Sequence, residues 1–224
     1  METLEFLELK TGDDPVASVI VLHGLGADGN DFVPIVRDLD LSSVGPVRFV
    51  FPHAPVRPIS IYNGYPMRAW YDILGQDLVR REDEAGLRES VTLVQALLDH
   101  EAARGMPPSR TVLMGFSQGC AMTLLAGLRA PQRLAGLVAL SGYLPLASTT
   151  AGERSAANAG VPIFMGHGRY DGVVPFARGE ASRDALKALG HEVDWHEYPT
   201  EHAVPPEEIA DLEAWLRKIL APVK

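Results

Sequence analysis

Residues 111–119 read TVLMGFSQG, and this stretch decides the interpretation of the chain. Its first four residues form a continuous apolar run, which predicts a strand buried on both faces. Gly115 and Gly119 flank Ser117 at minus two and plus two, and residues 118–128 predict a helix rich in small side chains. A sharp turn from strand to helix exposes the serine hydroxyl at the end of the sheet. We therefore predict a nucleophilic serine, the alternative being a glycine-rich turn with an incidental serine.

Short apolar runs alternate with longer amphipathic segments along the whole chain. Strands are predicted at residues 17–22, 47–51, 111–114, 137–140, 162–165 and 192–198, and helices at 30–39, 82–104, 118–128, 176–189 and 205–220. Residues 59–74 look irregular, and residues 147–160 look like a polar surface loop. The alternation predicts a single α/β domain over residues 1–224, with a mostly parallel central sheet and helices on both faces. Ligands bind outside the carboxyl ends of the strands in such sheets.

Composition excludes several classes of protein. The formal net charge is -9, and the lysines and arginines are scattered, which argues against a nucleic-acid partner. A single cysteine, Cys120, allows no disulfide within the chain. The N-terminus does not resemble a signal peptide, and no segment approaches the roughly 18 apolar residues of a spanning helix. We therefore expect a cytoplasmic protein without stable membrane insertion.

A nucleophilic serine needs a base, and chain order narrows the choice among the seven histidines. When the serine occupies a strand–helix turn of this kind, the acid and then the histidine follow it in sequence. His202 is the best placed of the later histidines, because it follows the predicted strand 192–198 at the carboxyl end of the sheet. Asp171 lies in the loop GHGRYDGVVP after the preceding strand. The alternatives are an ordinary surface histidine and a turn aspartate.

Backbone N–H groups are expected to stabilise the developing oxyanion. Gln118 follows the serine at the start of a helix, so its N–H is the first predicted donor. The loop HGLGADG at residues 23–29 follows the first buried strand, and we assign the Leu25 N–H as the second donor. This loop lacks the full pattern of a phosphate-binding loop. Cys120 is a rival nucleophile on paper, but it lies one turn into the helix, where we expect a small buried side chain.

Six sequence blocks together resemble the phospholipase/carboxylesterase family, which includes the acyl-protein thioesterases, and the bacterial carboxylesterases are the nearest branch. The blocks are LHGLGADGNDFVP, FPHAP, PMRAWYDI, GFSQGCAM, GHGRYDGVVP and EYPTEHAVPPEEI. The resemblance implies an α/β-hydrolase fold without a large lid, no metal or other cofactor, and in many members a homodimer. It places the catalytic and oxyanion positions of the family on Ser117, Asp171, His202, Leu25 and Gln118. It further implies that the substrate groove is lined by Trp70, Ile73, Leu74, Tyr143 and Val173.

The implied activity is that of a serine carboxylesterase, which cleaves short to medium acyl esters through an acyl-enzyme. An acyl-protein thioesterase or a lysophospholipase remains an alternative, and so does a peptidase or perhydrolase with the same triad. A catalytically silent binding protein is the alternative from a different class. Two departures from the family are visible: Cys120 stands where glycine is common, and residues 60–65 (SIYNGY) carry two tyrosines near the expected groove.

Overall fold

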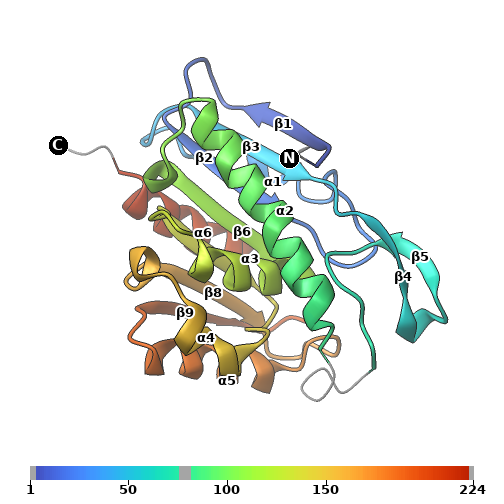
Figure 1. Ribbon diagram of the computed structural model, residues 1–224. Coiled ribbons are helices and arrows are strands. Elements are labelled where there is room, and N and C mark those ends of the chain that lie inside the picture. Colours follow the sequence, from blue (N-terminus) through green and yellow to red (C-terminus); the bar gives the residue numbers. More distant parts are fainter. Residues whose placement is uncertain (1–3, 76–81, 222–224) are drawn as a thin grey trace.

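The computed structural model describes residues 4–75 and 82–221, and within them a seven-stranded sheet forms the centre of the molecule (Figure 1). The strands lie in the order β1-β3-β2-β6-β7-β8-β9. All neighbours pair in parallel except β1, which runs antiparallel to β3. The strands are β1 (Phe6–Lys10), β2 (Ala17–Leu22), β3 (Val47–Pro52), β6 (Thr111–Phe116), β7 (Gly136–Leu140), β8 (Ile163–Gly168) and β9 (Val193–Tyr198).

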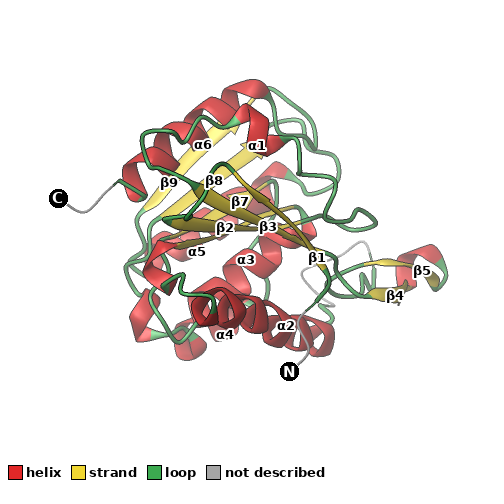
Figure 2. Cartoon of the chain, turned by 90° about the horizontal axis from the view of Figure 1, so that it is seen from above, coloured by secondary structure: helices red, strands yellow, loops and turns green. Residues whose placement is uncertain are grey.

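Helices cover both faces of this sheet (Figure 2). One face carries α1 (Ile35–Asp38) and α6 (Pro206–Ile219), and the other carries α2 (Glu84–Ala103), α3 (Gln118–Arg129), α4 (Ala147–Glu153) and α5 (Phe176–Ala188). Two apolar clusters fill the two interfaces, and strands β2, β3, β7 and β8 are buried along their whole length. The continuous apolar runs of the sequence correspond to these doubly covered strands.

The structure confirms the mostly parallel sheet with helices on both faces, but several local predictions are wrong and one strand was missed. The predicted helix at residues 30–39 shrinks to one turn, Ile35–Asp38, because the preceding residues form successive turns. The predicted loop at residues 147–160 contains α4 and a 3₁₀ helix, Ala156–Asn158. Strand β1 was not predicted at all. That the chain forms a single domain stays a prediction.

The segment 59–74, expected to be irregular, belongs to a two-stranded hairpin that projects from the body of the molecule (Figure 1). It is built from β4 (Val56–Ile59) and β5 (Tyr65–Arg68), joined by a 3₁₀ turn at Ser60–Tyr62. Pro58 faces Pro66 across the pair. Proline removes a donor from a strand, and a narrow ribbon with two edges tolerates this loss, so the prolines hid the hairpin from sequence reasoning.

Candidate active site

Ser117 lies at the turn between β6 and α3 in a strained backbone conformation, with φ 56° and ψ -116°. Left-handed φ values are rare outside glycine and persist where the surroundings enforce them. Here the two flanking glycines allow close packing: a Cβ on Gly115 would overlap the Gly119 carbonyl, and a Cβ on Gly119 would lie 2.5 Å from the Leu22 carbonyl carbon. The chain therefore turns tightly enough to present the hydroxyl at the carboxyl end of the sheet.

Three predicted residues from distant parts of the chain meet at this turn. The Oγ of Ser117 lies 2.9 Å from Nε2 of His202, and Nδ1 of His202 lies 2.6 Å from Oδ2 of Asp171. His202 is in the loop between β9 and α6, and its ring packs on that of Phe116, with 4.7 Å between the centroids. The chain of hydrogen bonds sets the imidazole tautomer, because Nδ1–H donates to the carboxylate and leaves Nε2 free to accept the hydroxyl proton.

The surrounding loop fixes the carboxylate of Asp171. Its Oδ1 accepts backbone hydrogen bonds from the N–H groups of Val173 and Val174, each at 2.8 Å. His167 lies on the other side: its Nε2 is 2.9 Å from the Val174 carbonyl and 3.5 Å from Asp171 Oδ2. Burial lowers the pKa of His167, so its imidazole is neutral and donates to the carbonyl. The Asp171 carboxylate is thus oriented toward His202 by fixed donors.

The predicted oxyanion donors lie on the two loops beside the serine. Leu25 follows β2, and Gln118 is the first residue of α3; both line one cavity together with Ser117. A Cβ on Gly24 would lie 3.4 Å from the Ser117 Cβ, which shows how closely the Leu25 loop approaches the nucleophile. The first N–H groups of a helix have no intrahelical acceptor, so the Gln118 amide is free to face a ligand.

The side chain of Gln118 has a second role that sequence reasoning missed. Its Oε1 accepts a hydrogen bond from the backbone N–H of Trp70, and its Nε2 donates one to the backbone carbonyl of Tyr71, both at 2.7 Å. The Trp70 indole N–H donates in turn to the His23 carbonyl, at 2.9 Å. Both ring nitrogens of His23 are bonded to backbone groups of Gly24 and Ala54, at 2.7 and 3.0 Å. These bonds tie the segment around Trp70 to both oxyanion loops.

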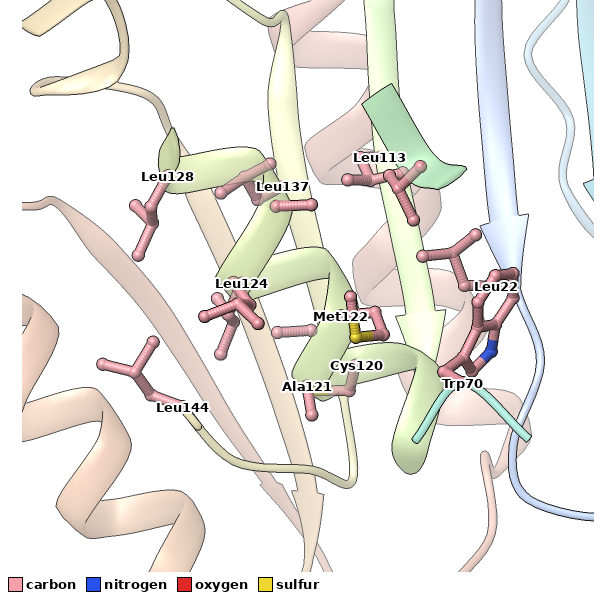
Figure 3. Close-up of a cluster of buried hydrophobic side chains, with 14 of the residues drawn as sticks. Leu22, Trp70, Leu113, Cys120, Ala121, Met122, Leu124, Leu128, Leu137 and Leu144 are labelled. Atoms are coloured by element: carbon pink, nitrogen blue, oxygen red, sulfur yellow. The ribbon is translucent and has the colours of Figure 1, made fainter. Parts of the chain in front are cut away.

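A cavity of about 610 Å³ opens beside the serine. Three of the five predicted groove residues line it: Ile73, Tyr143 and Val173. Trp70 does not, because its side chain is fully buried beside Leu22 (Figure 3). Leu74 is partly exposed and also lies outside the lining. Tyr62, one of the two tyrosines expected near the groove, also lines it. Sequence reasoning missed further lining residues, which are Ile61, Tyr71, Gly75, Gly172, Val174, Pro175 and Arg178.

Cys120 lies on the buried face of α3, inside the apolar cluster (Figure 3). Its Cβ and Sγ would both be 2.5 Å from a Cβ at Gly142, so the thiol fills the space that the glycine leaves. Burial raises the pKa of the thiol far above its ordinary value. A protonated thiol without solvent access cannot compete with Ser117 as a nucleophile.

The chain is similar in sequence to known proteins. The sequence model of the phospholipase/carboxylesterase family matches residues 6–220. The chain belongs to this family. Acyl-protein thioesterase 1 of Gibberella zeae is 42% identical over 215 residues, which cover 92% of each chain. The protein of the same name from Yarrowia lipolytica is 37% identical, over 90% of this chain and 91% of its own.

Two solved structures are similar to this chain in sequence and in fold. Acyl-protein thioesterase 2 of Zea mays is 30% identical with a TM-score of 0.86, and the match covers 97% of this chain and 99% of that one. SOBER1 of Arabidopsis thaliana is 31% identical with a TM-score of 0.87, over 91% and 99% of the two chains. This phospholipase/carboxylesterase family member therefore has the α/β-hydrolase fold, and it is a serine hydrolase of the esterase and thioesterase class.

The described residues offer neither a metal site nor a membrane-spanning helix. In the described residues, no group of three or more His, Cys, Asp or Glu side chains is arranged to hold a metal ion. None of the helices in the described ranges is long and apolar enough to span a bilayer. The homodimer and the cytoplasmic location expected from the sequence stay predictions.

Proposed function

We propose that this chain is a carboxylesterase that cleaves short to medium acyl esters through an acyl-enzyme on Ser117. The observation that carries the proposal is the unbroken series of hydrogen bonds from the serine hydroxyl through His202 to Asp171. A strained, partly buried serine with a base within hydrogen-bond reach, the base itself oriented by a carboxylate, is the arrangement that activates a serine nucleophile.

The geometry supports a two-step reaction. As Ser117 Oγ bonds to the acyl carbon, His202 Nε2 takes the hydroxyl proton, and Asp171 stabilises the imidazolium. His202 then gives this proton to the leaving alcohol or thiol as the ester or thioester bond breaks. Water then loses a proton to His202 as its oxygen bonds to the acyl carbon. His202 gives this proton to Ser117 Oγ as the acyl–Oγ bond breaks, which releases the carboxylic acid and the free serine.

The amides of Leu25 and Gln118 would bind the oxyanion in both steps. Each strong donor of this kind contributes roughly 3 to 4 kcal/mol to the transition state. The hydrogen bonds from the Gln118 side chain to Trp70 and Tyr71 hold the surrounding loops, so the donors are positioned before substrate arrives. Pre-organised donors need no reorganisation during the reaction.

The cavity beside Ser117 would hold the acyl chain. Its walls are largely apolar and aromatic, including Ile61, Tyr71, Ile73 and Tyr143. Each buried methylene of an acyl chain contributes about 0.8 kcal/mol, so binding should strengthen with chain length until the cavity is full. Hydrolysis of acyl-protein thioesters is the second candidate function, favoured by relatives named acyl-protein thioesterase 1 at up to 42% identity.

The test is the activity of wild type and Ser117→Ala on p-nitrophenyl esters from C2 to C12, beside a palmitoyl-peptide thioester. We expect the substitution to lower kcat by about six orders of magnitude. Ser42→Ala, on an exposed loop, serves as the matched control. Near-normal activity of Ser117→Ala would overturn the assignment. A fast thioester reaction that rises with chain length would favour the thioesterase over the general esterase.

A further inference from the structure

Arg178 is the one charged side chain among the described residues that line the cavity beside Ser117. It lies in the first turn of α5, just beyond the loop that holds Asp171. An apolar cavity for a simple fatty acyl chain has no need of a guanidinium in its wall. A cation there raises the question of which part of a substrate it meets.

The guanidinium of Arg178 has unused hydrogen-bonding capacity. Its Cζ lies 3.7 Å from the centroid of the Tyr143 ring, so the cation lies over the aromatic face. The Tyr143 hydroxyl is 3.0 Å from that of Tyr71. Nη1 of Arg178 is buried and has no hydrogen-bond acceptor among the described residues. A buried donor without an acceptor destabilises its site, and no internal partner among the described residues offsets the charge of this guanidinium at Nη1.

The nearest described carboxylate does not fill this role. Glu82 lines a neighbouring cavity of about 500 Å³, which shares Tyr143 and Arg178 as wall residues. The Glu82 carboxylate accepts instead from the Leu146 N–H, at 3.1 and 3.2 Å, and no ion pair within 4.0 Å joins it to Arg178. Burial raises the pKa of Glu82, while the Leu146 N–H and the charge of Arg178 lower it.

The position of His202 decides which part of a substrate faces Arg178. The leaving group must lie next to His202 Nε2, because this atom returns the proton to it. His202 does not line the cavity that contains Arg178, whereas Ser117, Leu25 and Gln118 do. The cavity therefore receives the acyl part of the ester, and Arg178 faces that part at a distance from the reacting carbonyl.

We propose that the cavity binds acyl groups that end in a carboxylate, so that half-esters of dicarboxylic acids are favoured substrates and Arg178 determines this specificity. A guanidinium offers a planar fork of donors that matches the two oxygens of a carboxylate. The terminal carboxylate would accept from the guanidinium of Arg178 and leave the intervening methylenes against Tyr71, Ile73 and Tyr143. This inference rests on the proposed esterase function of Ser117.

The experiment compares three methyl esters with one leaving group: monomethyl adipate, its neutral amide methyl 6-amino-6-oxohexanoate, and methyl hexanoate. The amide matches the acid in size and polarity, so the ratio of the two kcat/KM values isolates the charge. The ratio is measured by pH-stat for wild type, Arg178→Gln and Arg178→Lys. Arg183→Gln is the control, because Arg183 lies on the same helix but pairs with Asp184 and lies outside the cavity.

We expect wild type to favour the acid over the amide by about tenfold to a hundredfold, the usual effect of a hydrogen bond to a charged group. Arg178→Gln should abolish this ratio, Arg178→Lys should retain part of it, and Arg183→Gln should keep it. A wild-type ratio of one or less, or an equal ratio in Arg178→Gln, would overturn the inference while leaving the esterase function intact. Failure to hydrolyse all three esters would overturn the esterase function and this inference together.

Discussion

Substitution of Gly119 by alanine tests how the close approach of two elements shapes the site. Gly119 is the second residue of α3, and a Cβ there would overlap the Leu22 carbonyl oxygen and lie 2.7 Å from the His23 carbonyl oxygen. It would lie 2.5 Å from the Leu22 carbonyl carbon, whereas carbon atoms normally pack at about 3.5 to 4.0 Å. The helix must therefore move away from β2 by about 1 Å.

This movement has two consequences. Overpacking of this kind destabilises a protein by about 1–3 kcal/mol, against which the better helix propensity of alanine returns at most about 1 kcal/mol. The displacement also separates the Gln118 amide on α3 from the Leu25 amide after β2. A 1 Å misplacement of catalytic groups costs about a hundredfold in rate. We expect Gly119→Ala to lose both stability and kcat/KM.

The assay combines urea unfolding with ester kinetics on the folded enzyme. Gly152→Ala is the matched control, because Gly152 lies in α4 and a Cβ there would meet nothing within 4 Å. This control should be as stable as wild type or more stable, by up to about 1 kcal/mol, with unchanged kcat/KM. The reasoning is refuted if Gly119→Ala unfolds like wild type and retains its kcat/KM within twofold.

Three further predictions concern single side chains. Asp171→Asn should lower kcat by about four orders of magnitude with the fold intact by circular dichroism, since the tautomer of His202 is lost; a loss below tenfold would contradict this. Burial raises the pKa of Glu208 to about 8, so the folded chain retains a proton that the unfolded chain releases. The contribution of Glu208 to stability should therefore be fully present below about pH 4.5 and be lost as the pH rises to about 8, by a few kcal/mol. Glu208→Gln should make the free energy of unfolding in urea depend less on pH over this range; an equal dependence in wild type and variant would argue against a neutral buried acid. Cys120 should react with Ellman's reagent only after unfolding, because burial raises its pKa; rapid reaction of the native thiol would refute its placement.

The central sheet could be predicted because its strands are covered on both faces. Continuous apolar runs such as residues 17–22 and 137–140 are typical of strands buried on both faces, and these two runs form β2 and β7. The predicted helix 176–189 is observed as α5 (Phe176–Ala188), and Gly190 follows it with φ 85°, a conformation that glycine adopts readily after a helix. The edge strand and the projecting hairpin lacked continuous apolar runs. Strand β1 is only half-buried, and the hairpin β4–β5 carries a proline in each strand.

The residues of the candidate site were predictable to different degrees. Ser117, Asp171 and His202 each follow a strand of the parallel sheet, so chain order and sheet topology were enough to group them before their contacts were known. The supporting contacts depend on side-chain direction, which a linear pattern does not contain. The sequence indicated only that the backbone N–H of Gln118 is an oxyanion donor, yet its side-chain amide also holds the Trp70 segment. Arg178 gave no signal in sequence, because its significance comes from the cavity that it lines.

The most direct test of the account is to treat the native enzyme with a fluorophosphonate and locate the adduct by peptide mass spectrometry. The account predicts one adduct, on Ser117, formed as fluoride leaves the phosphorus, and a large loss of labelling rate in His202→Ala. Labelling of another residue, or equal labelling of Ser117 with and without His202, would contradict the claim that the imidazole activates this serine.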